Sequence, residues 1–163
     1  MRNPFAVTLV ASIGVALGAG ALASAPSSAD SRGGHAFTVA EATAQHTFLV
    51  ADPGSPPISL GDREVFSSVL SGDKRGTDGG VCTVVNVIDG PALTGVYSCN
   101  VTARFADGQI TGQALVLSTA GANPARFDIA VTGGTGAYEG ASGHVAVETL
   151  GPGRANLTFV LDA

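Results

Sequence analysis

Basic residues are scarce in this sequence, and their scarcity removes one large class of partners. The chain of 163 residues has 8 Lys and Arg against 13 Asp and Glu, a formal net charge of −5. Only Lys74 and Arg75 are adjacent, and the other basic residues are scattered. Because nucleic-acid binding needs clustered Lys and Arg to neutralise phosphates, a nucleic-acid partner is not expected.

Residues typical of metal and nucleotide sites are also few. The three histidines, His35, His46 and His144, lack the close-paired spacing of metal ligands, so no metal is expected, and His46 is expected to be packed or hydrogen-bonded. The glycine-rich run at 132–136 misses the dinucleotide-loop spacing and lacks a P-loop lysine, which favours a tight connection between strands with glycines at positive φ. No serine lies in a G-x-S-x-G motif. No cofactor is expected.

Charged residues make up only 13% of the chain, whereas hydrophobic residues make up 45% and there are 23 glycines. Such a chain is too apolar for disorder, and abundant Gly, Val and Thr favour short strands joined by tight turns. Strands are predicted at 36–50, 63–70, 81–88, 94–105, 109–118, 125–132, 143–150 and 155–161, and the Ala-rich middle of the first favours a kink or a split there. Eight strands with short connections predict a single all-β domain, an antiparallel up-and-down barrel that leaves no sheet edge exposed.

The N-terminal residues have the features of an export signal. Arg2 supplies a positive charge, residues 5–22 are uncharged and apolar, and small residues follow. We assign 1–29 to a signal peptide cleaved near residues 23–29, 30–35 to a flexible leader and 36–163 to the barrel. An apolar run of about 18 residues is also near the lower limit for a membrane anchor. Its Gly and Ala content and the small residues after it favour cleavage, so the protein is expected to be secreted and free of the membrane.

The two cysteines test the strand assignment. Folding this region about Gly90-Pro91 places three pairs of residues directly opposite each other: Cys82 and Cys99, Val84 and Tyr97, Ile88 and Leu93. Cβ atoms of opposed residues lie about 4.5–5.5 Å apart, close to what a disulfide needs. In an oxidising compartment a Cys82–Cys99 disulfide is therefore expected. The alternative is that Cys82 is a free thiol.

Several short segments resemble, in order, those of the allene oxide cyclase family. They are Gly54-Ser55-Pro56, Leu60-Gly61-Asp62, Phe66, 70–76, 80–85, 105–110 and Val-Thr-Gly-Gly-Thr-Gly at 131–136 with the residues up to 143. Residues 121–143 also resemble dirigent proteins, and the match to the two families together spans about residues 47–161. The resemblance implies an eight-stranded antiparallel barrel with an apolar pocket, often in homotrimers, that guides cyclisation or coupling of reactive intermediates.

The functional positions of the cyclase family carry other residue types in this chain. Aligned on Gly54-Ser55-Pro56, its strand-one glutamate, a nearby asparagine, a second-strand asparagine and a later tyrosine fall, in order, on Thr47, Leu49, Ser68 and Val116. Only the pocket cysteine is kept, as Cys82. Without the strand-one carboxylate, no group acts on the charge that develops in an epoxide opening, so allene oxide cyclisation is not expected.

The same alignment defines the rest of the predicted pocket. Asp128 matches the acidic position of dirigent proteins, but Glu139 replaces the arginine that follows their glycine turn, which argues against phenoxy-radical coupling. Glu41 is the only acid on the first-strand pocket face, and its alternative role is a solvated residue at the barrel mouth. The predicted pocket residues are Glu41, Gln45, Thr47, Leu49, Ser68, Tyr97, Val116 and Asp128.

We therefore expect a secreted barrel that binds a small apolar molecule and steers its cyclisation or isomerisation. Two alternatives stay open, a non-catalytic carrier or interaction scaffold and a barrel filled by its own side chains. The loss of acids and amides from the family's positions favours binding over chemistry. The sequence leaves open whether the protein is an enzyme.

Overall fold

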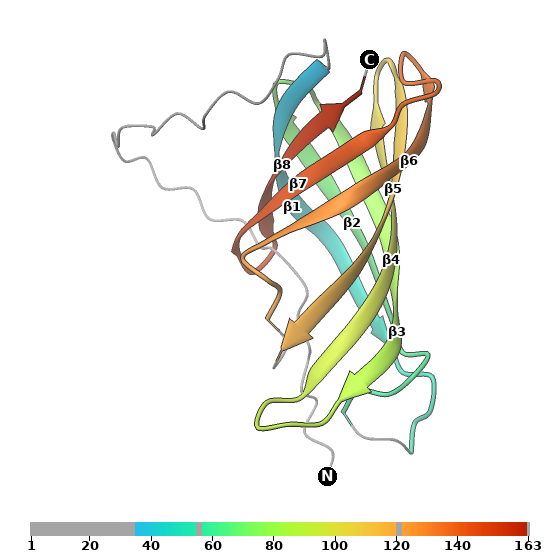
Figure 1. The fold of residues 1–163 in the computed structure, drawn as a ribbon, viewed down its shortest axis with the longest axis vertical. Coiled ribbons are helices and arrows are strands. Elements are labelled where there is room, and N and C mark those ends of the chain that lie inside the picture. The colour runs from blue at the N-terminus through green and yellow to red at the C-terminus, as the bar shows by residue number, and fades with distance from the viewer. Residues whose placement is uncertain (1–34, 55–56, 120–121, 163) are drawn as a thin grey trace, which may run out of the picture.

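The computed structural model describes residues 35–54, 57–119 and 122–162 (Figure 1). The predicted signal peptide and residues 30–34 of the predicted leader lie outside the described residues, and His35 belongs to the first strand. The strands are β1 (His35–Leu49), β2 (Arg63–Gly72), β3 (Gly76–Ile88), β4 (Thr94–Phe105), β5 (Gly108–Thr119), β6 (Arg126–Gly136), β7 (Gly143–Gly151) and β8 (Arg154–Leu161). No helix long and apolar enough to cross a membrane occurs among the described residues.

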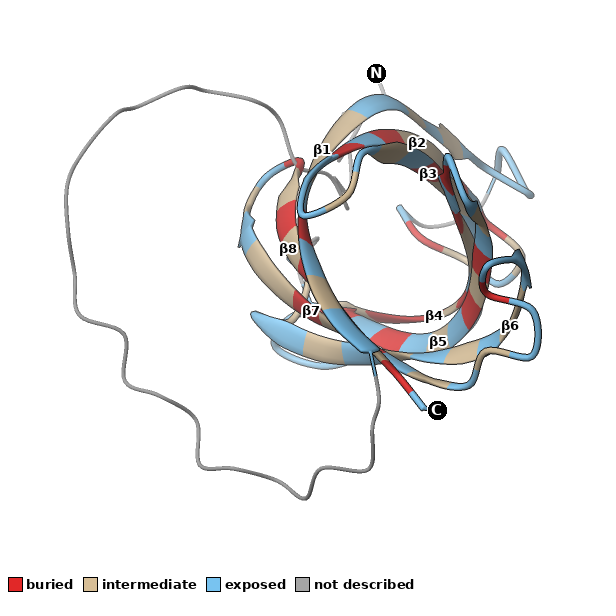
Figure 2. Ribbon diagram, turned by 90° about the horizontal axis from the view of Figure 1, so that it is seen from above, coloured by how far each residue is buried: buried red, intermediate tan, exposed pale blue. Residues whose placement is uncertain are grey.

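The strands form a closed antiparallel barrel, which confirms the predicted fold. Each strand pairs with the next one along the chain, and β1 also pairs with β8 to close the ring (Figure 2). Successive side chains of a strand point to opposite faces. In β8, buried residues accordingly alternate with half-buried ones. The buried side chains gather inside the ring, where a ligand site can form.

The register of β3 and β4 agrees with the prediction near the cysteines and departs from it near the turn. Cys82 pairs with Cys99 and Val84 with Tyr97, as predicted. Ile88 pairs with Thr94, so the predicted pairing with Leu93 is wrong. The reason is a register shift between Val84 and Asn86, where Val85 is an extra residue in β3.

The glycine-rich run is the end of a strand, and the chain reverses just after it. β6 continues through Gly133 and Gly134 to Gly136, and Gly136 and Gly140 then adopt φ of 64° and 75°. A Cβ atom on Gly134 would lie 2.4 Å from the carbonyl oxygen of Tyr138. The turn therefore begins later than predicted.

Aromatic side chains fill one end of the barrel. The rings of Phe37 and Phe159 stack with centroids 4.7 Å apart, and Phe105 meets both rings edge-on. Tyr138 packs against Phe37 and Phe105. Burial of these rings stabilises the fold and closes this end of the lumen.

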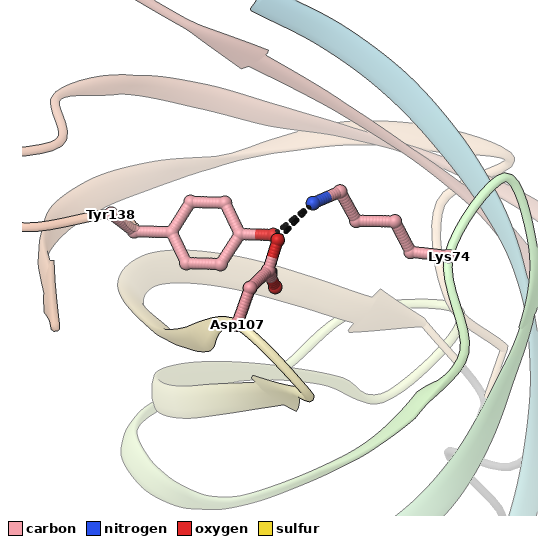
Figure 3. Close-up of polar contacts among 3 residues, drawn as sticks. All are labelled: Lys74, Asp107 and Tyr138. Carbon is pink, nitrogen blue, oxygen red and sulfur yellow. Dashed lines mark hydrogen bonds and ion pairs between the residues drawn. The ribbon is translucent and has the colours of Figure 1, made fainter. Parts of the chain in front are cut away.

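Tyr138 also belongs to a polar cluster of three turn residues, which we call the latch (Figure 3). Lys74, Asp107 and Tyr138 come from the β2–β3, β4–β5 and β6–β7 connections. Lys74 Nζ donates to Asp107 Oδ2 and to Tyr138 Oη at 2.6 Å each, and Tyr138 Oη donates to Asp107 Oδ1 at 2.9 Å. The ammonium group also lies 5.2 Å from the centroid of Phe37. The latch ties together three turns at one end of the barrel.

The connection between β1 and β2 folds over the opposite end. Asp62 is fully buried, and its carboxylate accepts hydrogen bonds from the amides of Ala51 and Ser59 and from the Ser59 hydroxyl. This holds Ile58 in a buried cluster with Tyr97 and the cysteine pair. Ile58 thereby acts as an apolar plug for this end.

The wall of the barrel is incomplete on one side. Pairing of β5 with β6 ends at Gln113 and Ala130, and pairing of β1 with β8 ends at Ala42 and Arg154. Towards the plugged end, the wall consists of β1 to β5 alone. The interior is therefore reached from the side, beside residues 122–125 and 152–153.

Candidate functional site

A cavity of about 480 Å³ lies inside the barrel between the aromatic end and the disulfide. Its wall is mainly apolar and includes Phe66, Val101, Ile110, Val116, Phe127 and Leu157. The Cys82–Cys99 disulfide is present and forms part of this wall. Ala122, Asn123 and Pro152, which belong to the connections at the side opening, also line it. A volume of this size with few polar groups is typical of sites for one small organic molecule.

Two carboxyl groups interrupt the apolar wall, Glu41 on β1 and Asp78 on β3. Ser68 on β2 lies between them, because it pairs directly with Asp78 and with Thr43, two residues beyond Glu41 on the same face. The Ser68 hydroxyl donates to Glu41 Oε1 at 2.7 Å. Since a hydroxyl has one hydrogen, it can donate to only one of the two carboxylates at a time.

Asp78 is the more isolated of the two acids. Its residue is 6% exposed, and its Oδ1 atom has no hydrogen-bond partner among the described residues. Burial raises the pKa of Asp78 to about 7, with a further rise from the charge of Glu41 and an opposing effect of hydrogen bonding to Ser68. Burial also raises the pKa of Glu41, against the hydrogen bond from Ser68. The two carboxyls therefore hold a proton more readily than exposed acids do.

One cationic side chain, Arg154, also lines the cavity. It begins β8 beside the side opening, is half-buried and takes part in an interaction within the protein. The described residues contain no group of three or more His, Cys, Asp or Glu side chains placed to hold a metal ion.

Comparison with protein families identifies the barrel. Residues 38–161 match the family described as the allene oxide cyclase barrel like domain, most of the chain. The chain belongs to this family. A search of curated proteins gives no significant match.

Solved structures similar to this barrel include a demethylase, a Diels-Alderase and a dirigent protein. A pyocyanin demethylase is 28% identical with a TM-score of 0.63, covering 78% of this chain and 99% of its own. The Diels-Alderase AbmU from Streptomyces koyangensis is 14% identical with a TM-score of 0.56, covering 82% of this chain and 71% of its own. The pterocarpan synthase dirigent protein GePTS1 is 16% identical with a TM-score of 0.53, covering 78% of this chain and 82% of its own. The last two likenesses concern the fold alone.

The predicted pocket residues occupy three different environments in this allene oxide cyclase-like barrel. Glu41 and Val116 line the cavity, and Ser68 hydrogen-bonds to Glu41. Tyr97 is fully buried in the cluster around the plug. The four others are exposed, namely Gln45, Thr47, Leu49 and Asp128.

A β-bulge explains why most of the first-strand positions leave the cavity. The register of β1 against β2 shifts between Thr43 and Gln45, which leaves Ala44 as an extra residue. The alternation of faces therefore reverses, and His46 rather than Gln45 faces inward. His46 contacts the fully buried carboxylate of Glu64, and burial lowers the pKa of the imidazole.

Tyr97 has a buried hydroxyl, but Tyr97 is not one of the residues that line the cavity. Its Oη has no hydrogen-bond partner among the described residues. Burial raises the pKa of Tyr97 to about 12, with further contributions from the charges of Glu64 and Asp62. The phenol therefore stays protonated and neutral at physiological pH.

Asp78 is the site residue that the sequence prediction missed. The third strand was predicted to begin at residue 81, which left Asp78 outside any strand. The length of β4 is the signal that could have found it. In the register set by the cysteines, a strand that runs to Phe105 needs partners as far back as Gly76. That extension places Asp78 opposite Ala103, which also lines the cavity.

Proposed function

We propose that this barrel binds one small, largely apolar molecule in its cavity and steers the cyclisation or isomerisation of that molecule. The observation that carries the proposal is the apolar cavity of about 480 Å³ with two neighbouring carboxyl groups on its wall. Enclosure favours one conformer of a flexible substrate, which lowers the entropy cost of an intramolecular reaction.

Asp78 and Glu41 are the groups that would move a proton on the bound molecule. General acid–base catalysis is most efficient when the pKa of the group lies near the working pH, and the pKa of Asp78 is about 7. The hydroxyl of Ser68 links the two carboxyls, so a proton taken by one can be shared with the other. Allene oxide cyclisation itself is not proposed, because the position of the family's strand-one glutamate is Thr47, which is exposed.

A non-catalytic carrier is the second candidate function. Both cysteines form the disulfide, so neither offers a nucleophilic thiol in the cavity. A carrier would use the same apolar wall without proton transfer. The variant Asp78→Asn distinguishes the two, because it removes an acid–base group while it keeps the shape of the side chain.

Native mass spectrometry of the folded protein tests whether the cavity is used. We expect a co-purified small molecule that is released on denaturation, or saturable binding of a hydrophobic dye to protein stripped of ligand. Ala114→Phe, which projects into the cavity, should reduce dye binding, whereas Leu115→Phe on the outer face of the same strand is the matched control. Protein that is empty and also binds no dye would contradict the proposal.

We also propose that the protein is exported after cleavage of its N-terminal residues. The disulfide supports this, because stable disulfides are typical of oxidising compartments. The mass of the mature chain recovered outside expressing cells tests it. We expect an N-terminus within residues 23–30, and a full-length chain retained in the cell would contradict export.

A further inference from the structure

We propose that the ligand of this cavity is an apolar molecule with a single protonated nitrogen, which the carboxyl groups of Asp78 and Glu41 bind. The proposal rests on the proposed function, because it names the class of molecule that the same cavity takes. The proposal follows from two features of the cavity. Its wall is mainly apolar, and it holds two adjacent acids, one of which has an oxygen atom without a hydrogen-bond partner among the described residues.

The unpartnered oxygen is the first step of the argument. Asp78 Oδ1 belongs to a residue that is 6% exposed, lies in the cavity wall and accepts no hydrogen bond from any described residue. Buried polar atoms are almost always hydrogen-bonded, because an unmade bond costs the full desolvation of the group. The atom is therefore placed to accept a hydrogen from a bound molecule.

The second step concerns the charge of that donor. Glu41 lies beside Asp78 across Ser68, and the negative charges of the two acids raise each other's energy. A buried charge is costly unless an opposite charge compensates it. A protonated nitrogen at Asp78 Oδ1 provides both the hydrogen and the opposite charge, whereas a neutral donor provides only the hydrogen.

Arg154 is the group in the cavity wall that would favour an anionic ligand over a cationic one. Its guanidinium also belongs to the cavity lining, so an anionic ligand could in principle approach it. However, Arg154 is half-buried at the side opening and engaged within the protein, whereas Asp78 is buried. An anion in the cavity would also face two carboxyl groups. We therefore expect the acids to decide the selectivity.

Three probes with one aromatic skeleton and different charges test the proposal. They are 1-naphthylmethylamine, which is protonated at neutral pH, the neutral 1-naphthylmethanol, and the anionic 1-naphthoic acid. Binding to the full mature protein at pH 7.5 is measured by calorimetry. We expect the amine to bind about 10- to 100-fold more tightly than the alcohol, the range for a charge-assisted hydrogen bond, and the acid to bind most weakly.

Isosteric variants test whether the two acids cause the preference for the amine, and a third variant is the control. Asp78→Asn should bring the affinity for the amine to within a few-fold of that for the alcohol, with little change for the alcohol itself. Glu139→Gln removes one negative charge from an exposed turn and should leave all three affinities unchanged. If Asp78→Asn fails to fold, Glu41→Gln should lower the amine preference in the same direction.

The outcomes separate this inference from the proposed function. Equal binding of amine and alcohol to the wild-type protein, or tighter binding of the acid, would overturn the inference and leave the apolar cavity as a binding site. An amine preference that survives in Asp78→Asn and Glu41→Gln would also overturn it. Failure of all three probes and of a hydrophobic dye to bind would overturn the proposed function as well.

Discussion

Asp78 is a buried acid whose charge is unfavourable for the folded state. It is buried in an apolar wall beside Glu41, and its pKa is raised from 3.8 to about 7. Between those two values the folded protein holds a proton that the unfolded chain has lost. The free energy of unfolding must therefore fall as the pH rises from about 4 to about 7, and stay level with respect to this group above that.

Asp78→Asn should remove this pH dependence. We expect the variant to be more stable than wild type at pH 8 by a few kcal/mol, since each unit of pKa shift is worth about 1.4 kcal/mol, and nearly equal in stability at pH 4. Urea unfolding at several pH values measures the difference. Glu41 and Arg154 face the same cavity but are present in both proteins, so their effects largely cancel. A constant difference between pH 4 and pH 8 would contradict the assigned burial of the charge.

The strands and their register could be predicted in part from the sequence. Alternating apolar residues and turn residues were enough for all eight strands, and the opposed cysteines were enough for the register of β3 and β4 around the disulfide but not near the turn. The Ala-rich middle of β1 favoured a kink there, but the extra residues themselves, Ala44 and Val85, were not predictable, because no glycine or proline marks either position. One extra residue reverses the faces of the strand, so Gln45, Thr47 and Leu49 moved out of the predicted site.

The β3–β4 hairpin is the element in which a covalent bond reinforces strand pairing. The disulfide joins residues 17 positions apart, and a loop of that size contributes about 3 kcal/mol in the chain-entropy model. The double variant Cys82→Ala/Cys99→Ala should therefore lose about that much free energy of unfolding in urea.

The redox state of the wild-type protein provides the control for this prediction. Addition of a reductant should lower the urea midpoint of wild type and leave that of the double variant unchanged. Equal midpoints for oxidised wild type and the double variant would contradict a stabilising role. The hairpin would then be held by strand pairing alone.

At the scale of the whole molecule, the outer face of the barrel carries apolar side chains that could contact other copies of the chain. Large apolar side chains are exposed on neighbouring strands, including Val65 and Val81, which pair directly across β2 and β3, and Leu115 on β5. Scattered exposed apolar residues are ordinary, but neighbouring ones on a sheet often mark a contact surface. Together with the homotrimers implied by the family resemblance, this leads us to propose that three copies pack through the β2–β5 face.

Light scattering coupled to size-exclusion chromatography tests this assembly. We expect a trimer for the wild-type protein and a monomer for Val81→Lys combined with Leu115→Lys, because a buried lysine without a partner charge disfavours the contact. Leu150→Lys places a lysine at another exposed leucine, near the end of β7, and should leave the trimer intact. If the wild-type protein is a monomer at micromolar concentration, the apolar face has no role in self-association. If Leu150→Lys alone gives monomers, the contact lies on the β7 side of the barrel and beside the opening to the cavity.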